Sequence, residues 1–202
     1  MLFAEKPVRS VREQIVDTLR AEVLGGAWDN NAPVREQALA ERFGVSRGPI
    51  RDALQELSRE GVLTYQPNKG VRVNKPPVGA ERQLLQSMRR EMETFCLSQC
   101  MDQLTGSDDE QLQLILHDLT RACSRGEVSA IADSDLSLHR FLVRSASKEL
   151  EIVWQSVASR VLMDYTRCEC YDEVVQEHTS IVEAVINRDL ESAHQAILKN
   201  II

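Results

Sequence analysis

The chain has 202 residues, of which 43% are hydrophobic, and its formal net charge is −7 at neutral pH. A chain of this length and composition can bury one or two hydrophobic cores, which excludes a disordered tail. The five cysteines form no Cys-x-x-Cys pair, and no run of about 18 apolar residues occurs. A cysteine zinc knuckle and a membrane span are therefore not expected, and we predict a cytoplasmic protein.

Charge divides the chain into two unequal parts. Residues 1–75 carry 12 basic and 10 acidic side chains, whereas the remaining residues carry 12 and 21. Phosphate repels an acidic domain, so contact with a polyanion is expected in the first part only. The proline-containing segment NKPPVGAE is typical of a linker. We therefore predict one domain at 1–75, a linker at 76–81 and a second domain at 82–202.

The first domain has the element order of a winged helix-turn-helix. Apolar residues at four-residue intervals indicate a first helix that ends in a pair of glycines. Gly44 ends the second helix, and Ser46 is expected to cap the third through its side chain, with Pro49 in the first turn. The turn sequence QPNKG separates two β-rich runs. Helices are expected at 9–26, 35–43 and 46–61, and strands at 62–65 and 71–73.

The second domain shows helical patterns throughout and no strand pattern. Six amphipathic segments within about 120 residues predict a helical bundle. The fold class is therefore mainly α, with an N-terminal winged helix-turn-helix followed by an all-α bundle. The expected helices are 81–104, 108–125, 127–147, 149–168, 171–187 and 190–202.

The start of the third helix has the chemistry of a DNA-recognition helix. Arg47 and Arg51 are four residues apart and project from one face, and arginine can pair with guanine through two hydrogen bonds. The alternative for such a pair is a solvated helix face. The helix start and the wing offer further phosphate contacts. The predicted DNA-binding residues are Arg35, Gln37, Ser46, Arg47, Gly48, Arg51, Lys69 and Gly70.

The bundle contains one pattern with possible metal chemistry. Asp135 and His139 are four residues apart on one helix, so a carboxylate oxygen and an imidazole nitrogen can converge, and His178 can join them from another helix. This donor set suits Zn²⁺, Ni²⁺, Mn²⁺ or Fe²⁺. The spacing alone is more often that of a surface pair.

The run LAERFGVSRGPIRDALQELSREGVLTYQPNKGVRV resembles the winged helix of the GntR family of bacterial transcription regulators, and the match extends over residues 8–73. Residues 81–202 resemble the FCD ligand-binding domain of the FadR-type members, in its six-helix form. The resemblance implies a homodimer on a palindromic operator. It also implies a divalent metal held by Asp135, His139 and His178, with Asn200 where the family has a last histidine.

The same resemblance places Arg89 in the pocket of a small carboxylate effector, although a salt bridge with Glu93 is the alternative for Arg89. We therefore expect a ligand-responsive transcriptional regulator, a repressor rather than an enzyme. One alternative is a constitutive DNA-binding dimer whose bundle only dimerises. A metallohydrolase is a remote alternative, because no general base lies between Asp135 and His139.

Overall fold

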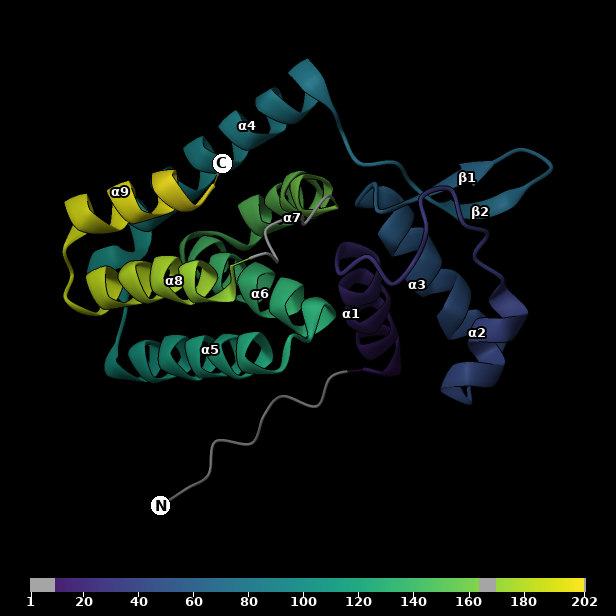
Figure 1. The fold of residues 1–202 in the computed structure, drawn as a ribbon, viewed down its shortest axis with the longest axis horizontal. Coiled ribbons are helices and arrows are strands. Elements are labelled where there is room, and N and C mark those ends of the chain that lie inside the picture. Colours follow the sequence, from purple (N-terminus) through teal and green to yellow (C-terminus); the bar gives the residue numbers. More distant parts are fainter. Residues whose placement is uncertain (1–9, 164–169, 202) are drawn as a thin grey trace.

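The computed structural model describes residues 10–163 and 170–201, and its elements follow the predicted order (Figure 1). The last part of the helix predicted at 149–168 falls outside the described residues. Three helices and a hairpin come first, namely α1 (Val11–Leu24), α2 (Glu36–Phe43), α3 (Arg47–Arg59), β1 (Leu63–Gln66) and β2 (Gly70–Val73). The bundle follows with α4 (Gly79–Cys100), the 3-10 turn η1 (Met101–Gln103), α5 (Gly106–Arg125), α6 (Val128–Ala146), α7 (Lys148–Leu162), α8 (Tyr171–Ile186) and α9 (Leu190–Asn200).

Local chemistry accounts for the ends of the first helices. Ser10 and Glu13 form a capping box at the start of α1, in which each side chain accepts a hydrogen bond from the other residue's backbone N–H. Gly44 ends α2 in the left-handed region with φ 65°. Ser46 lies at the N-cap of α3, but its side chain accepts no capping hydrogen bond. That prediction was wrong, because the start of α3 is exposed and water can satisfy its amides.

The wing is a two-stranded antiparallel hairpin in which Leu63 pairs with Val73 and Gln66 with Gly70. The Lys69 amide donates to the Gln66 carbonyl at 3.0 Å across the turn. Asn68 and Gly70 both have positive φ, at 61° and 76°. Asparagine and glycine tolerate this conformation best, which explains why QPNKG closes the hairpin.

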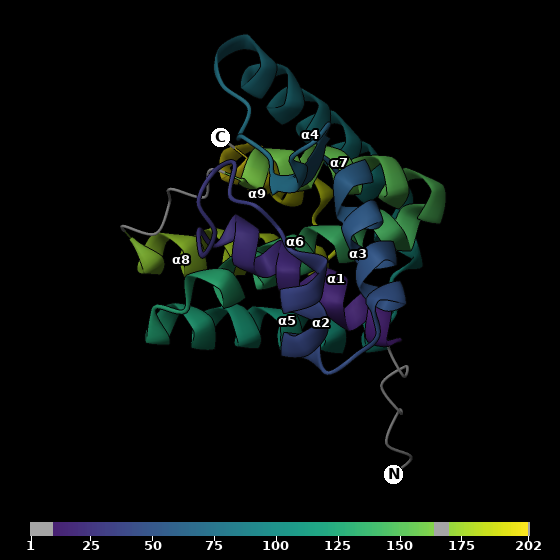
Figure 2. The ribbon, with the colours of Figure 1, turned by 90° about the vertical axis from the view of Figure 1, so that its right-hand side faces the viewer.

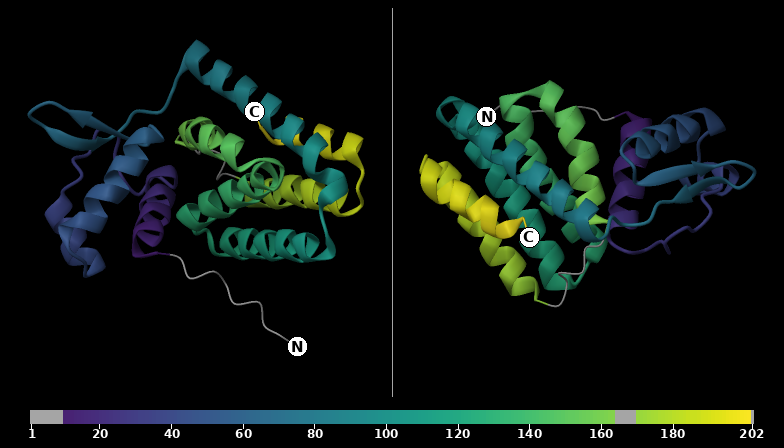
Figure 3. Two further views of the ribbon diagram at one scale, coloured as in Figure 1. Left: turned by 180° about the vertical axis from the view of Figure 1, so that it is seen from behind. Right: turned by 90° about the horizontal axis from the view of Figure 1, so that it is seen from above.

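The two parts of the chain share one hydrophobic core. Ile15 and Leu19 of α1 and Leu57 of α3 belong to the same buried cluster as Leu136 of α6 and Trp154 of α7. The winged helix-turn-helix lies at one end of the molecule, where α1 faces the bundle (Figures 1 and 3). Figure 2 looks onto this end, with α1, α2 and α3 in front of the bundle helices.

A buried polar contact reinforces this junction. Arg20 of α1 donates to both carboxylate oxygens of Glu60 at 2.8 and 2.6 Å, and Glu60 follows the last turn of α3. Ser159 of α7 donates to Glu60 at 3.3 Å. Arg160, the next residue, donates to the Lys75 carbonyl at 2.7 Å. The bundle therefore contacts both the end of α3 and the segment that leaves the wing.

The six predicted bundle helices are confirmed within the described residues. A second buried cluster joins α4, α5, α6, α8 and α9, with Leu97, Leu112, Leu138, Ile181 and Ile197 among its fully buried members. Gly126 ends α5 with φ 66°, as a left-handed C-cap. No described helix is long and apolar enough to cross a membrane.

Candidate DNA-binding surface and metal centre

The two arginines at the start of α3 are exposed and contact α2. Arg51 Nε donates to a carboxylate oxygen of Glu36 at 2.8 Å, and Arg47 donates to the side-chain oxygen of Gln37. The Arg51 side chain is 64% exposed. Both guanidinium groups are therefore held by α2 while they stay open to an outside partner.

The other predicted DNA-binding residues lie at the starts of α2 and α3 and on the wing. A Cβ added at Gly48 would be 4.0 Å from Ser46 Oγ, so the fold itself does not require glycine there. Close approach of an outside partner to the backbone is another reason for a glycine at position 48. Lys69 is exposed at the tip of the wing, and Arg35 is exposed at the start of α2. These roles stay predictions, and the arrangement suits contact with phosphates.

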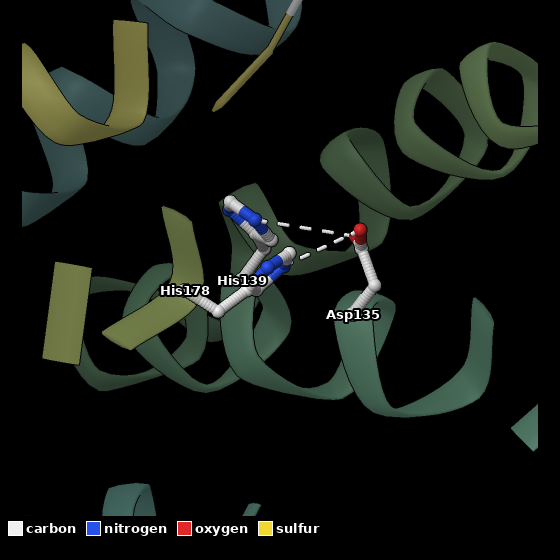
Figure 4. Close-up of side chains that lie close together, drawn as sticks. All are labelled: Asp135, His139 and His178. Carbon is white, nitrogen blue, oxygen red and sulfur yellow. Dashed lines mark ion pairs between the residues drawn. The ribbon is translucent and has the colours of Figure 1, made fainter. Parts of the chain in front are cut away.

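Asp135, His139 and His178 form a buried cluster (Figure 4). Asp135 and His139 are one turn apart on α6, and His178 comes from α8. The His178 Nε2 atom lies 3.3 Å from one oxygen of Asp135, and His139 Nε2 lies 4.0 Å from the other. One ligand atom from each residue lies within 4.8 Å of the others, as expected of groups that share a cation.

The hydrogen bonds of the two imidazoles fix which nitrogen faces the cluster. His139 Nδ1 lies 2.5 Å from a carboxylate oxygen of Glu93, and His178 Nδ1 lies 2.8 Å from the Val174 carbonyl. Both partners are acceptors, so each Nδ1 carries the hydrogen and each neutral ring presents the lone pair of Nε2. His139 Nε2 is buried and has no hydrogen-bond partner among the described residues. A divalent cation fits this donor set.

Charges around the cluster favour the ionised carboxylates. Burial alone would raise the pKa of Asp135, but His178, His139 and Arg89 lower it well below its usual range. Burial would also raise the pKa of Glu93, yet Arg89 and His139 lower it to about 2. For His178, burial opposes the charged form, whereas Asp135 favours it and raises the pKa above the usual value. Both acids are therefore anionic at neutral pH.

Arg89 is buried between Glu93 and Asp135. Its Nε donates to Glu93 at 2.7 Å, which is the salt bridge given above as an alternative. Its Nη2 also lies 3.7 Å from Asp135, beside the candidate metal centre. A role in effector binding stays a prediction.

Asn200 is buried at the end of α9, and its amide nitrogen donates to Glu177 at 3.0 Å. Glu177 is the residue before His178, so Asn200 lies near one candidate ligand in the fold. Arg90 fixes this end of α9 by donating to the Ile201 carbonyl at 2.7 Å. His194 instead contacts the Thr94 carbonyl and the Ser98 hydroxyl of α4. Metal ligation by Asn200 stays a prediction.

Two residues of the site were absent from the sequence predictions. Glu93 was considered only as a salt-bridge partner of Arg89, and Trp154 was given no role at the site. Trp154 is fully buried and its Nε1 donates to Glu93 at 2.7 Å. A signal that could have indicated burial of Glu93 is its helical spacing from Arg89. The same face of α4 carries the buried residues Cys96 and Leu97.

The fold defines a winged-helix regulator with a C-terminal helical bundle. Residues 11–73 match the gntR family of bacterial regulatory proteins, and residues 85–201 match the FCD domain. The chain belongs to the GntR family and carries an FCD domain. It is accordingly a DNA-binding transcriptional regulator, a class that is distinct from enzymes.

Similar proteins carry related names. The transcriptional repressor RspR of Escherichia coli is 24% identical over 96% of this chain and 87% of its own length. A probable D-xylose utilization operon repressor of Paenarthrobacter nicotinovorans is also 24% identical, over 95% of this chain and 86% of its length. Among solved structures, E. coli McbR/YncC has a TM-score of 0.77 and 21% identity over 96% of this chain and 94% of that one, which shows the shared fold.

Proposed function

We propose that this protein is a cytoplasmic repressor that binds a palindromic operator as a homodimer and responds to a small organic acid bound beside a divalent metal. Residues 1–75 serve as the DNA-binding domain, 76–81 as the linker, and 82–202 as the effector and dimerisation domain. One observation carries the sensor part of the proposal. Two buried imidazoles, both with Nδ1 engaged, direct Nε2 toward the buried carboxylate of Asp135.

The DNA-binding part rests on exposed chemistry at the start of α3. Arg47 and Arg51 would read operator guanines or adjoining phosphates, because their present partners on α2 are surface contacts that DNA can replace. Lys69 at the wing tip and Arg35 at α2 would hold the backbone. Repression is the activity named for two relatives and is carried over here as part of the proposal.

The sensor part assigns a role to each buried group. Asp135, His139 and His178 would hold Zn²⁺, Ni²⁺ or Mn²⁺, with the amide of Asn200 as a weaker fourth ligand. The bound metal supplies a positive charge to which a carboxylate can bind. Arg89, whose guanidinium already lies beside Asp135, would donate further hydrogen bonds to that carboxylate.

Homodimerisation is supported by an exposed apolar stripe on α4. Leu84, Met88 and Phe95 are 62%, 39% and 56% exposed. Their spacing places them on one face of the helix, since four and eleven residues both return close to the same direction. A second copy related by a twofold axis would bury this stripe against its own equivalent.

The effector would act by shifting a population between DNA-binding and released arrangements. It must bind the released arrangement more tightly, and a tenfold preference supplies about 1.4 kcal/mol. The second candidate function is a constitutive DNA-binding dimer. Arg89 and Asn200 favour it, because both already have protein partners in the bundle.

Metal content is the first test. Protein purified without a histidine tag or chelator would be analysed by elemental mass spectrometry, with a His178→Ala variant beside it. We expect close to one divalent ion per wild-type chain and none in the variant. An operator selected from random duplexes would then be titrated with and without small carboxylates. Metal-free wild-type protein whose operator affinity no carboxylate changes would favour the constitutive dimer.

A further inference from the structure

Glu93 of α4 is a buried carboxylate whose partners come from its own helix and from two others. The side chain is 1% exposed, and one of its oxygens accepts from Arg89 Nε and from Trp154 Nε1, each at 2.7 Å. The other oxygen lies 2.5 Å from His139 Nδ1. Arg89 belongs to α4, His139 to α6 and Trp154 to α7. Arg89 and Trp154 therefore share one oxygen of Glu93, and His139 contacts the other.

A purely structural ion pair would not need this arrangement. Arg89 alone can neutralise the charge of Glu93, and a salt bridge within one helix requires nothing from α6. The contact with His139 has a separate consequence, because it decides which imidazole nitrogen carries the hydrogen. Free histidine side chains in water exchange between two neutral tautomers, and only one of them presents Nε2 as a ligand.

We propose that Glu93 is a positioning residue of the metal centre, which holds His139 in the Nδ1–H tautomer and directs its Nε2 lone pair toward Asp135 and His178. This inference rests on the metal site in the proposed function. Trp154 and Arg89 donate to the other oxygen of Glu93, so the contact with His139 does not depend on either donor alone. The oxygen of Glu93 that faces His139 lies at hydrogen-bond distance from Nδ1, and the Arg89 guanidinium lies 2.7 Å from the other oxygen.

The test compares two variants of the full chain that differ at Glu93. In Arg89→Met with Glu93→Leu, both members of the buried pair are replaced together, so neither is left as an unpaired buried charge. Arg89→Met alone keeps the contact between Glu93 and His139. Long-range ¹H–¹⁵N spectra of chelator-treated protein would report the tautomer of His139, assigned with a His139→Gln variant. Zn²⁺ affinity would be measured by competition with a chromogenic chelator.

We expect the double variant to lose the Nδ1–H preference and to bind Zn²⁺ roughly 10- to 100-fold more weakly than wild type. Arg89→Met should keep the tautomer and should not weaken Zn²⁺ binding, because it removes a positive charge near Asp135. Weaker Zn²⁺ binding in the double variant alone separates the positioning role of Glu93 from general damage to the ion pair.

If the double variant does not fold, two further variants test the same proposal. Trp154→Phe removes one donor to Glu93 and should leave the tautomer in place. Glu93→Gln removes the charge at nearly constant shape and should weaken Zn²⁺ binding. If the Glu93 variants that fold keep both the Nδ1–H tautomer and the Zn²⁺ affinity of Arg89→Met, the positioning role is overturned. A wild-type chain that binds no Zn²⁺ overturns the metal centre itself.

Discussion

Arg51 Nε lies 2.8 Å from a carboxylate oxygen of Glu36, so an arginine at the candidate DNA-binding surface is paired with an acid of the neighbouring helix. The two side chains are 64% and 35% exposed. Exposed pairs of this kind contribute about 0–1 kcal/mol, so phosphate or guanine can replace Glu36 at little cost. The pair holds Arg51 in place and at the same time competes with DNA for it.

Replacing Arg51 by alanine should reduce specific binding more than non-specific binding. If Arg51 pairs with a guanine, Arg51→Ala costs roughly 1–3 kcal/mol on the operator, whereas salt-sensitive binding to random duplex survives better. Fluorescence anisotropy at fixed salt with both duplexes measures the difference. An equal loss on the two duplexes would leave Arg51 with a phosphate contact only.

Removal of the Glu36 charge, which competes with DNA for Arg51, should raise operator affinity. Glu36→Gln abolishes the ion pair with Arg51 and also removes a negative charge close to the DNA. We expect operator affinity to rise by up to about fivefold, which corresponds to an exposed pair of at most 1 kcal/mol. Glu151→Gln, which alters an acid that pairs with Arg144 in the bundle, is a matched control and should change nothing. A drop in affinity for Glu36→Gln would show that Glu36 orients Arg51 more than it competes.

Metal affinity should fall in mild acid. Asp135 raises the pKa of His178, and the metal needs the neutral imidazole. Above that raised pKa the ring is neutral and no proton competes. Below it, each bound metal displaces a proton, so the dissociation constant should increase by about tenfold per pH unit. Zn²⁺ titrations between pH 5 and about 8 locate the break. A flat profile would contradict a shared site for His178 and the metal.

Two glycines should respond differently to alanine. A Cβ added at Gly25 would lie 2.5 Å from Ser129 Cα, a backbone atom that cannot rotate away, so Gly25→Ala should cost roughly 1–3 kcal/mol in unfolding free energy. Gly48→Ala has space and should leave stability unchanged. If the backbone at Gly48 approaches DNA, the second variant should still lose operator affinity. Urea unfolding measures the stability of the two variants, and fluorescence anisotropy measures their operator affinity.

A charge on the apolar stripe of α4 should separate the proposed dimer. Leu84→Glu with Phe95→Glu places two anions where a twofold axis would bring their equivalents close together. We expect a monomer by sedimentation and a large loss of operator affinity, with unchanged helical content. Leu114, which is 63% exposed on α5, is the matched control position. A dimer that survives both charges on α4 would place the interface elsewhere.

Much of the fold could be predicted from local sequence signals. The bounds of the helices follow from apolar spacing and from glycines such as Gly44 and Gly126, which adopt left-handed conformations just after helix ends. The hairpin follows from a turn sequence whose Asn68 and Gly70 have positive φ. These signals act within a few residues, so no alignment or structure is needed to interpret them. Ser46 was the exception, because an exposed helix start does not require a side-chain cap.

The site was predictable only in part, because its contacts cross the bundle. Asp135 and His139 share a helix and could be paired by spacing, with His178 as a candidate from another helix, and the family resemblance added Asn200. The link between Glu93 and His139 joins residues 46 positions apart, and that between Glu93 and Trp154 joins residues 61 apart. Periodicity reports which face of a helix is buried, but not which acid on one helix meets which ring on another.

The contact between Glu60 and Ser159 has a consequence for how such regulators diversify. The recognition helix ends in an acid that the bundle itself engages, and Gly61 leaves room for Arg160 just beyond it. Exchange of DNA-binding domains between related regulators would therefore succeed only when both sides of this junction are inherited together. A chimera that joins one protein's α3 to another's α7 would lose the matched contacts by which the bundle holds the end of α3.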